Sequence, residues 1–321
     1  MKRNVFAEWR GKESCDVSAI GIHRTLSSMP ESTASKRGRL LLVHAHPDDE
    51  SINNGATMAK YAHEGFEVAL VTCTRGEEGE ILLPELADAA SDKRDRLAEI
   101  REGELANALE ALGVSRHWYL GAPELRFRDS GMMDTPQNAR PDVFWNADVD
   151  EAAALLAHYI VEFKPHVLVT YDEFGGYGHP DHIQAHRVTM QAAELSERLG
   201  WQIAKIYWNV MPKSLVQKSM DAMREIGSDF FGAESIDDIP FAKDDSFVHA
   251  VIDGNKYVEM KKEAMKAHRT QIAVDGPFFA LSNLLGMQVF GYEYYTRVKG
   301  VAGPEIDAQG HESDLFSGIT L

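Results

Sequence analysis

Residues 40–50, which read Leu-Leu-Leu-Val-His-Ala-His-Pro-Asp-Asp-Glu, decide the fold. The apolar part, residues 40–43, does not alternate with polar residues, which favours a strand buried on both faces of a parallel sheet. Pro47 cannot continue a central strand, so the strand should end before it. In open α/β sheets, ligands bind just past the carboxyl ends of strands. The side chains that we expect at that place are His46, Asp48 and Asp49.

A second cluster of the same residue types follows another apolar run. Residues 178–182 read Gly-His-Pro-Asp-His and come soon after the strand-like residues 166–171. Alone, the first cluster would also suit a polar surface turn, but a second cluster of this kind makes that alternative much weaker. Proline is favoured at the first position of a helix, so we expect His179 at the N-cap and His182 in the first turn.

Length, composition and charge indicate a soluble globular protein, and the negative charge is compatible with a neutral or cationic substrate or simply with solubility. The chain has 321 residues, of which 44% are hydrophobic and 26% charged, and its net charge is −17. This charge argues against nucleic acid and anionic membranes as partners, and no stretch approaches the ~20 apolar residues of a membrane helix. The oligomeric state stays open. Two cysteines make no disulfide framework, so Cys73, in a strand-like run, is expected to be a buried free thiol in a cytoplasmic protein rather than a nucleophile.

Strands and helices alternate along most of the chain, which predicts βαβ units. Strands are expected over 40–44, 67–74, 117–120 and 166–171, and helices over 53–64, 93–112, 148–163 and 180–199. After residue 201 the expected strands are 203–210, 247–252 and 290–298, and the expected helices are 214–226 and 257–268. The fold class is therefore α/β, a Rossmann-like, mostly parallel sheet with helices on both faces and a smaller C-terminal α+β portion.

The expected domain organisation has four parts. Residues 1–38 form a disordered extension, within which Met29 is a plausible alternative start, and 39–200 form the catalytic domain. Residues 201–304 form an α+β portion that completes the site, and 305–321 form a mobile tail.

The two clusters together suit a metal-dependent hydrolase. A catalytic zinc takes three protein ligands and keeps an open position, and His46, Asp49 and His182 would supply such a set. Neighbouring side chains diverge, so Asp48 can act on the attacking water while Asp49 binds metal. Asp181 can accept a hydrogen bond from an imidazole and fix its tautomer.

These motifs resemble the LmbE-like (PIG-L-type) family of zinc-dependent N-deacetylases. The residues that carry the resemblance are His-Pro-Asp-Asp-Glu at 46–50 and His-Pro-Asp-His at 179–182. The likeness is closer to the mycothiol-pathway branch of actinobacteria through Val-Thr-Cys-Thr-Arg-Gly-Glu-Glu-Gly-Glu at 71–80, Gly-Tyr-Gly at 176–178, Arg-Asp-Ser-Gly at 128–131 and Thr-Gln at 270–271. It covers roughly residues 39–300.

The resemblance implies a role for each matching residue. The metal, zinc or ferrous iron, is bound by His46, Asp49 and His182, and Asp48 is the general base. His179 stabilises the oxyanion or serves as an acid, and Tyr177 also approaches the oxyanion. The positions that hold sugar or inositol hydroxyls are Glu80, Arg101 and Asp129.

The resemblance also implies the reaction, hydrolysis of the acetamide of N-acetylglucosaminyl-inositol to acetate and a free amino sugar. The main alternative is the related amidase that cleaves mycothiol S-conjugates with the same metal site. Amidase-type sequences place Lys where this chain has Asn53, which favours the deacetylase. A nucleotide-binding module of Rossmann type is a remote alternative, because no Gly-x-Gly-x-x-Gly follows the first strand.

Overall fold

The computed structural model of the chain describes residues 38–123, 125–225, 232–273 and 291–321. Seven strands in these ranges form one sheet in the order β3-β2-β1-β4-β5-β9-β8. They are β1 (Arg39–His44), β2 (Glu67–Thr72), β3 (Arg116–Tyr119), β4 (Val167–Thr170), β5 (Lys205–Asn209), β8 (Ala250–Asp253) and β9 (Tyr292–Lys299). The first five strands in this order are parallel, and β9 runs antiparallel to both β5 and β8. The mostly parallel sheet expected from the sequence is confirmed.

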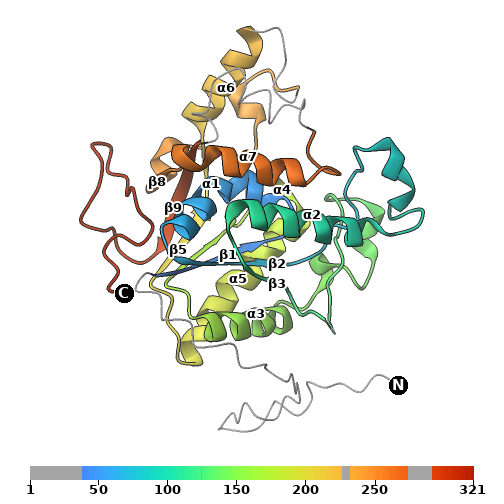
Figure 1. Cartoon of the computed structure of the whole chain (residues 1–321), viewed down its shortest axis with the longest axis horizontal. Helices are drawn as coiled ribbons and strands as arrows, with labels where there is room; N and C mark the ends of the chain where they lie inside the picture. Colours follow the sequence, from blue (N-terminus) through green and yellow to red (C-terminus); the bar gives the residue numbers. More distant parts are fainter. Residues whose placement is uncertain (1–37, 124, 226–231, 274–290) are drawn as a thin grey trace. The chain divides into compact units, whose positions relative to one another are not determined.

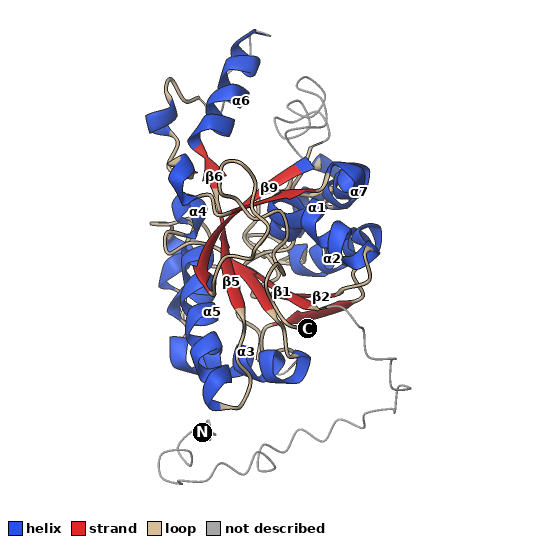
Figure 2. Cartoon of the chain, turned by 90° about the vertical axis from the view of Figure 1, so that its left-hand side faces the viewer, coloured by secondary structure: helices blue, strands red, loops and turns tan. Residues whose placement is uncertain are grey.

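Helices cover both faces of this sheet (Figures 1 and 2). The side chains of β1 alternate between two apolar clusters, with Leu40 and Leu42 in one and Leu41 and Val43 in the other. The first cluster is covered by α1 (Asp49–His63), α2 (Leu97–Leu112) and α7 (Val258–Ala267), and the second by α3 (Val149–Phe163) and α5 (Pro180–Arg198). Burial on both faces explains why residues 40–43 are all apolar.

The expected strands and helices of the first 200 residues are present, with shifted ends. The largest shifts are at the starts of α1, which begins at Asp49 rather than at residue 53, and α2, which begins at Leu97 rather than at residue 93. The first turn of α1 is acidic, with Asp49 and Glu50, and has no apolar period that would have marked it as helical. Acidic side chains there are stabilised by the positive end of the helix dipole.

Short elements complete the described fold. A two-stranded sheet of β6 (Met211–Pro212) and β7 (Ala242–Lys243) lies beside α6 (Lys213–Glu225). The remaining helical turns are η2 (Pro84–Ala89), η3 (Pro136–Ala139), η4 (Phe144–Asn146), α4 (Gly175–Gly178), η5 (Ile236–Asp238), η6 (Asp245–Phe247) and η7 (Asn255–Tyr257). The α6 region has its own small apolar cluster, which includes Val216, Met220 and Met223.

The C-terminal stretch packs against the sheet and helices, so the expectation of a mobile tail over 305–321 is wrong. Leu315 and Phe316 are buried in the cluster that contains Leu40. The Tyr61 hydroxyl donates to Asp314 Oδ1 at 2.7 Å and accepts from the Leu315 backbone N–H at 2.8 Å. Leu315 and Phe316 stand among polar residues in the sequence, so no apolar pattern marked this stretch as part of the core.

The domain boundaries expected from the sequence stay predictions. Residues 1–37 of the expected extension lie outside the described residues. The described residues from Gly38 on belong to one compact unit, and β5, β8 and β9 of the C-terminal portion continue the sheet that β1–β4 begin. Strands β1 and β4 are neighbours in the sheet, and the helices that follow them, α1 and α5, lie on opposite faces. The two predicted motifs follow these two strands, so they meet at the point where the strand order changes direction.

Candidate metal centre and active site

Three predicted metal ligands converge at this edge of the sheet. The Nε2 atom of His182 lies 3.3 Å from His46 Nδ1 and 3.4 Å from Asp49 Oδ1, and His46 Nδ1 lies 3.5 Å from Asp49 Oδ2. Donor atoms of a tetrahedral site with bonds of about 2.0–2.1 Å lie roughly 3.3 Å apart. The three donor groups therefore fit a small divalent cation. A nitrogen of His179 lies within 4.8 Å of those of His46 and His182, so these three imidazoles form a second donor set that could hold a metal ion.

Each histidine of the triangle is held so that its lone pair faces the centre. His46 Nε2 lies 3.1 Å from Asp181 Oδ2; with the proton on Nε2, the ring donates there and leaves Nδ1 as the acceptor. Asp181 is itself held by the Ser130 N–H at 2.9 Å and by the Ser130 hydroxyl. The His182 ring is hydrogen-bonded to the backbone of Gly175, and burial lowers the pKa of His182 to about 4.

A glycine turn and two aromatic rings shape the wall around His182. Gly175 has φ +65, and a Cβ there would lie 2.6 Å from the Cβ of His182, so both the backbone and the space require glycine. The Tyr171 ring stacks on the His182 ring with centroids 4.3 Å apart, and the Tyr177 ring meets it edge-on at 5.0 Å. Tyr177 comes from the same turn, α4, and is 44% exposed. It can therefore touch both the centre and an incoming ligand.

Asp48 lies next to the triangle and faces a different partner from Asp49. Its Oδ2 atom is 3.1 Å from Arg101 NH2, whereas Asp49 faces the two imidazoles. Burial, together with neighbouring Asp49, raises the pKa of Asp48 to about 6 against the opposing effect of Arg101. The backbone of Asp48 has φ +120, a conformation that costs a non-glycine residue about 1–3 kcal/mol and is found mainly at functional sites.

His179 occupies the N-cap of α5, as the sequence predicted, with Pro180 as the first helical residue. Its Nδ1 atom accepts the Asp181 backbone N–H at 3.1 Å, so the ring proton must be on Nε2. Burial and the neighbouring imidazoles of His46 and His182 lower the pKa of His179 to about 2. The ring is therefore neutral near pH 7 and offers a single N–H donor.

The three positions expected to hold substrate hydroxyls lie in different surroundings. Asp129 is buried, accepts the backbone N–H groups of Gly131 at 2.8 Å and Glu78 at 3.2 Å, and has Oδ1 3.7 Å from His46 Nε2. Glu80 is exposed. Arg101 is buried, with its guanidinium directed at protein groups.

Sequence reasoning did not assign three side chains that complete the centre. Tyr171 and Ser130 hold His182 and Asp181, as described above. His268, from the end of α7, places Nε2 2.8 Å from Glu50 Oε1, and both side chains are fully buried. Glu50 lies inside the first motif, and a carboxylate that is buried there needs a cationic or hydrogen-bond-donating partner. The sequence does not indicate which residue that partner is.

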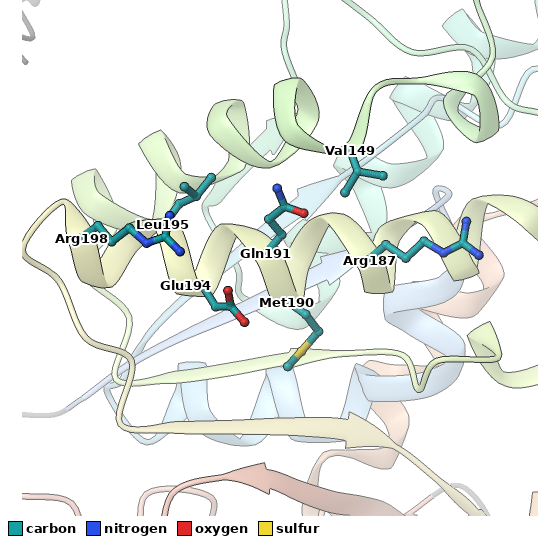
Figure 3. A pocket seen from close by; sticks show the side chains of 7 residues that line it. All are labelled: Val149, Arg187, Met190, Gln191, Glu194, Leu195 and Arg198. Atoms are coloured by element: carbon teal, nitrogen blue, oxygen red, sulfur yellow. The ribbon is translucent and has the colours of Figure 1, made fainter. Parts of the chain in front are cut away.

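Three further findings on the described residues concern a cysteine, a surface hollow and the helices. Cys73 is buried and free, as expected. A surface hollow of about 520 Å³ lies along α5 and contains none of the predicted site residues (Figure 3). Its lining is Val149, Arg187, Met190, Gln191, Glu194, Leu195 and Arg198. Within the described ranges, no helix is long and apolar enough to cross a membrane.

Comparison with known proteins gives a strong match in sequence. The model of the PIG-L family, described as GlcNAc-PI de-N-acetylase, matches residues 41–193. A protein of Catenulispora acidiphila named 1D-myo-inositol 2-acetamido-2-deoxy-alpha-D-glucopyranoside deacetylase 1 is 54% identical over 303 residues, covering 91% of this chain and 93% of the relative.

Solved structures with this fold differ in chemistry. An N,N'-diacetylchitobiose deacetylase from Pyrococcus horikoshii aligns with a TM-score of 0.53 at 18% identity, covering 82% of this chain and 84% of that one. The 4-carboxy-2-hydroxymuconate hydratase from Pseudomonas putida also aligns with a TM-score of 0.53, at 15% identity over 84% of this chain and 100% of that one. These likenesses show the fold alone, so the chemistry must be argued from the side chains.

Proposed function

The chain belongs to the PIG-L family, and we propose that it is a metal-dependent N-deacetylase that hydrolyses the acetamide of N-acetylglucosaminyl-inositol to glucosaminyl-inositol and acetate. The reaction class is supported by one observation above all, the triangle of His46, Asp49 and His182 donor atoms with the Asp48 carboxylate beside it. The substrate is supported by the name of the Catenulispora acidiphila relative at 54% identity. We place the reaction in mycothiol biosynthesis in the cytoplasm.

We infer that the metal held by this triangle is zinc. Two imidazoles and one carboxylate suit zinc, and they also suit ferrous iron. When bound there, the ion would polarise the acetamide carbonyl and lower the pKa of a water molecule. Asp181 supports the set by fixing the His46 tautomer, and such outer carboxylates raise metal affinity.

Asp48 is the proposed general base for the attacking water. Its Oδ2 atom is held by Arg101, and within the described residues its Oδ1 atom accepts no hydrogen bond. That oxygen can take a proton. A carboxylate whose pKa is raised to about 6 is still ionised at pH 7 and is a stronger base than an ordinary Asp.

His179 and Tyr177 are the proposed donors to the oxyanion that forms as water attacks. The neutral His179 ring carries its proton on Nε2 because Nδ1 accepts the Asp181 N–H. A neutral imidazole of this kind donates a hydrogen bond but is a poor source of a proton. We therefore assign the return of the proton to the leaving amine to Asp48, which gained it in the first step.

Substrate contacts are proposed for Asp129 and Glu80. Asp129 is held by two backbone N–H groups near the centre, and the exposed Glu80 follows the glycine loop that ends at Gly79. Carboxylates accept hydrogen bonds from sugar hydroxyls, and a site built around hydroxyls discriminates against analogues that lack them.

Parallel assays on two substrates test the function. The zinc-loaded protein should release a primary amine and acetate from N-acetylglucosaminyl-inositol much faster than it cleaves a mycothiol S-conjugate. Asp49→Asn, which removes a proposed ligand charge, is the negative control. Faster cleavage of the conjugate would make the amidase the correct function, and hydrolysis that is unaffected by metal removal would refute the mechanism.

A further inference from the structure

The Arg101 guanidinium is enclosed by the protein and directed at Asp48. Its side chain is 3% exposed. NH1 donates to the Gly76 carbonyl at 2.9 Å, and NH2 donates both to the Pro47 carbonyl and to Asp48 Oδ2, the latter at 3.1 Å. The residue preceding Asp48 and the Asp48 carboxylate are thus held by one nitrogen. A planar guanidinium directs its two terminal nitrogens at separate acceptors, here the Gly76 carbonyl from NH1 and the Pro47 and Asp48 oxygens from NH2, which a single ammonium nitrogen cannot reproduce.

The loop that closes over Arg101 is adapted to the guanidinium. Gly76 has φ +68, and a Cβ there would lie 2.0 Å from Arg101 NH1. A Cβ at Gly79 would lie 2.8 Å from the same nitrogen. Both glycines therefore leave room for the arginine head. The loop covers the guanidinium and leaves little of it for a ligand.

A second buried group holds the backbone of Asp48 from the other side. Glu50 Oε2 accepts the Asp48 N–H at 2.9 Å, and Glu50 Oε1 lies 2.8 Å from His268 Nε2. Glu50 and His268 are both fully buried. The φ of +120 at Asp48 is thus fixed on one side by Glu50 with His268 and on the other by Arg101.

We propose that Arg101 is a positioning residue for the general base: it aims the Asp48 carboxylate and fixes the strained backbone beneath it, rather than reading the inositol of the substrate. The inference rests on the proposed function, since it takes Asp48 as the base. Oδ2 is the oxygen that Arg101 holds, which leaves Oδ1 available to take the proton of the attacking water. A base that is misplaced by about 1 Å can lose roughly 100-fold in rate.

The test separates kcat from KM on two acetyl sugars. Arg101→Met and Arg101→Lys are assayed with N-acetylglucosaminyl-inositol and with plain N-acetylglucosamine, which lacks the inositol. Positioning predicts that kcat falls by roughly 100-fold in the Met variant on both substrates alike, with KM and bound zinc little changed. Arg101→Ala should regain part of its kcat when guanidinium ion is added, because the ion can occupy the vacated space.

The matched control is Arg126→Met. Arg126 pairs with Glu102 of the same helix that carries Arg101, and its side chain is 33% exposed. The kcat of Arg126→Met should equal that of the unmodified protein. A selective rise in KM for the inositol substrate, with kcat intact on both sugars, would overturn the proposal, as would loss of zinc or absence of guanidinium rescue. If the unmodified protein hydrolyses only N-acetylglucosamine, the proposed substrate fails, while the comparison of Arg101 variants on that sugar still decides the positioning role.

Discussion

Replacing Glu312 should destabilise the whole compact unit, although the residue lies only nine positions before Leu321. Its side chain is fully buried, and it accepts from Lys205 Nζ at 2.5 Å, from the Gly303 N–H at 2.7 Å and from the Tyr207 hydroxyl at 3.0 Å. Arg297 also pairs with it. The carboxylate therefore joins the C-terminal stretch to β5 and β9.

The magnitude follows from the partner that would be left behind. The Lys205 side chain is 3% exposed, so Glu312→Ala would leave a buried ammonium without its counter-charge. Breaking a buried ion pair in this way costs about 3–5 kcal/mol. At about 2 °C per kcal/mol for a chain of this size, Tm should fall by roughly 6–10 °C. Urea unfolding followed by tryptophan fluorescence would measure the free energy directly.

The pH dependence gives an independent check. Burial alone would raise the pKa of Glu312, but Lys205 and the Gly303 N–H outweigh it and hold the pKa below its ordinary value. A depressed folded-state pKa stabilises the fold above the ordinary Glu pKa of about 4.3, and that contribution is lost as pH falls through the folded-state value. The gap in stability between the unmodified protein and Glu312→Gln should therefore narrow from pH 7 toward acid.

The control is Glu305→Gln, an exposed residue in the same stretch. Surface substitutions of this kind usually stay within about 0.5 kcal/mol. If Glu312→Ala is no less stable than that control, or if the gap to Glu312→Gln does not change with pH, the packing role of the C-terminal stretch is refuted.

Asp48→Asn should retain bound metal but lower kcat by about 10²–10⁴-fold, as measured by acetate release beside elemental analysis; loss of metal as well would mean that the roles of Asp48 and Asp49 are reversed. His182→Ala should abolish high-affinity metal binding, because one of the three converging donor atoms is gone, and competition with a chelating dye reads this directly. Full retention of the metal would exclude His182 as a ligand. Asp181→Asn should weaken metal affinity by about 10–100-fold through His46, whose Nε2 it accepts from, and an unchanged affinity would contradict that link.

Much of the fold, and the convergence of His46, Asp49 and His182, could be predicted because the signals are local. Residues 40–43 are all apolar, which predicts a strand that is buried on both faces, and Pro47 marks the end of that strand. Pro180 marks the start of a helix, which placed His179 at the N-cap. The expectation that Asp48 and Asp49 diverge needed only their adjacency. Information of this kind lies within a few residues of the feature that it predicts.

Only the tertiary structure decided which distant side chains serve these residues. Asp181 reaches His46 across 135 positions, Arg101 reaches Asp48 across 53, and His268 reaches Glu50 across 218. Such pairs follow from the order of the strands and the packing of helices on the sheet, and a periodicity within one segment carries no information about its partner. For the same reason the resemblance alone implied a substrate contact for Arg101, whereas the fold encloses its side chain against the proposed base.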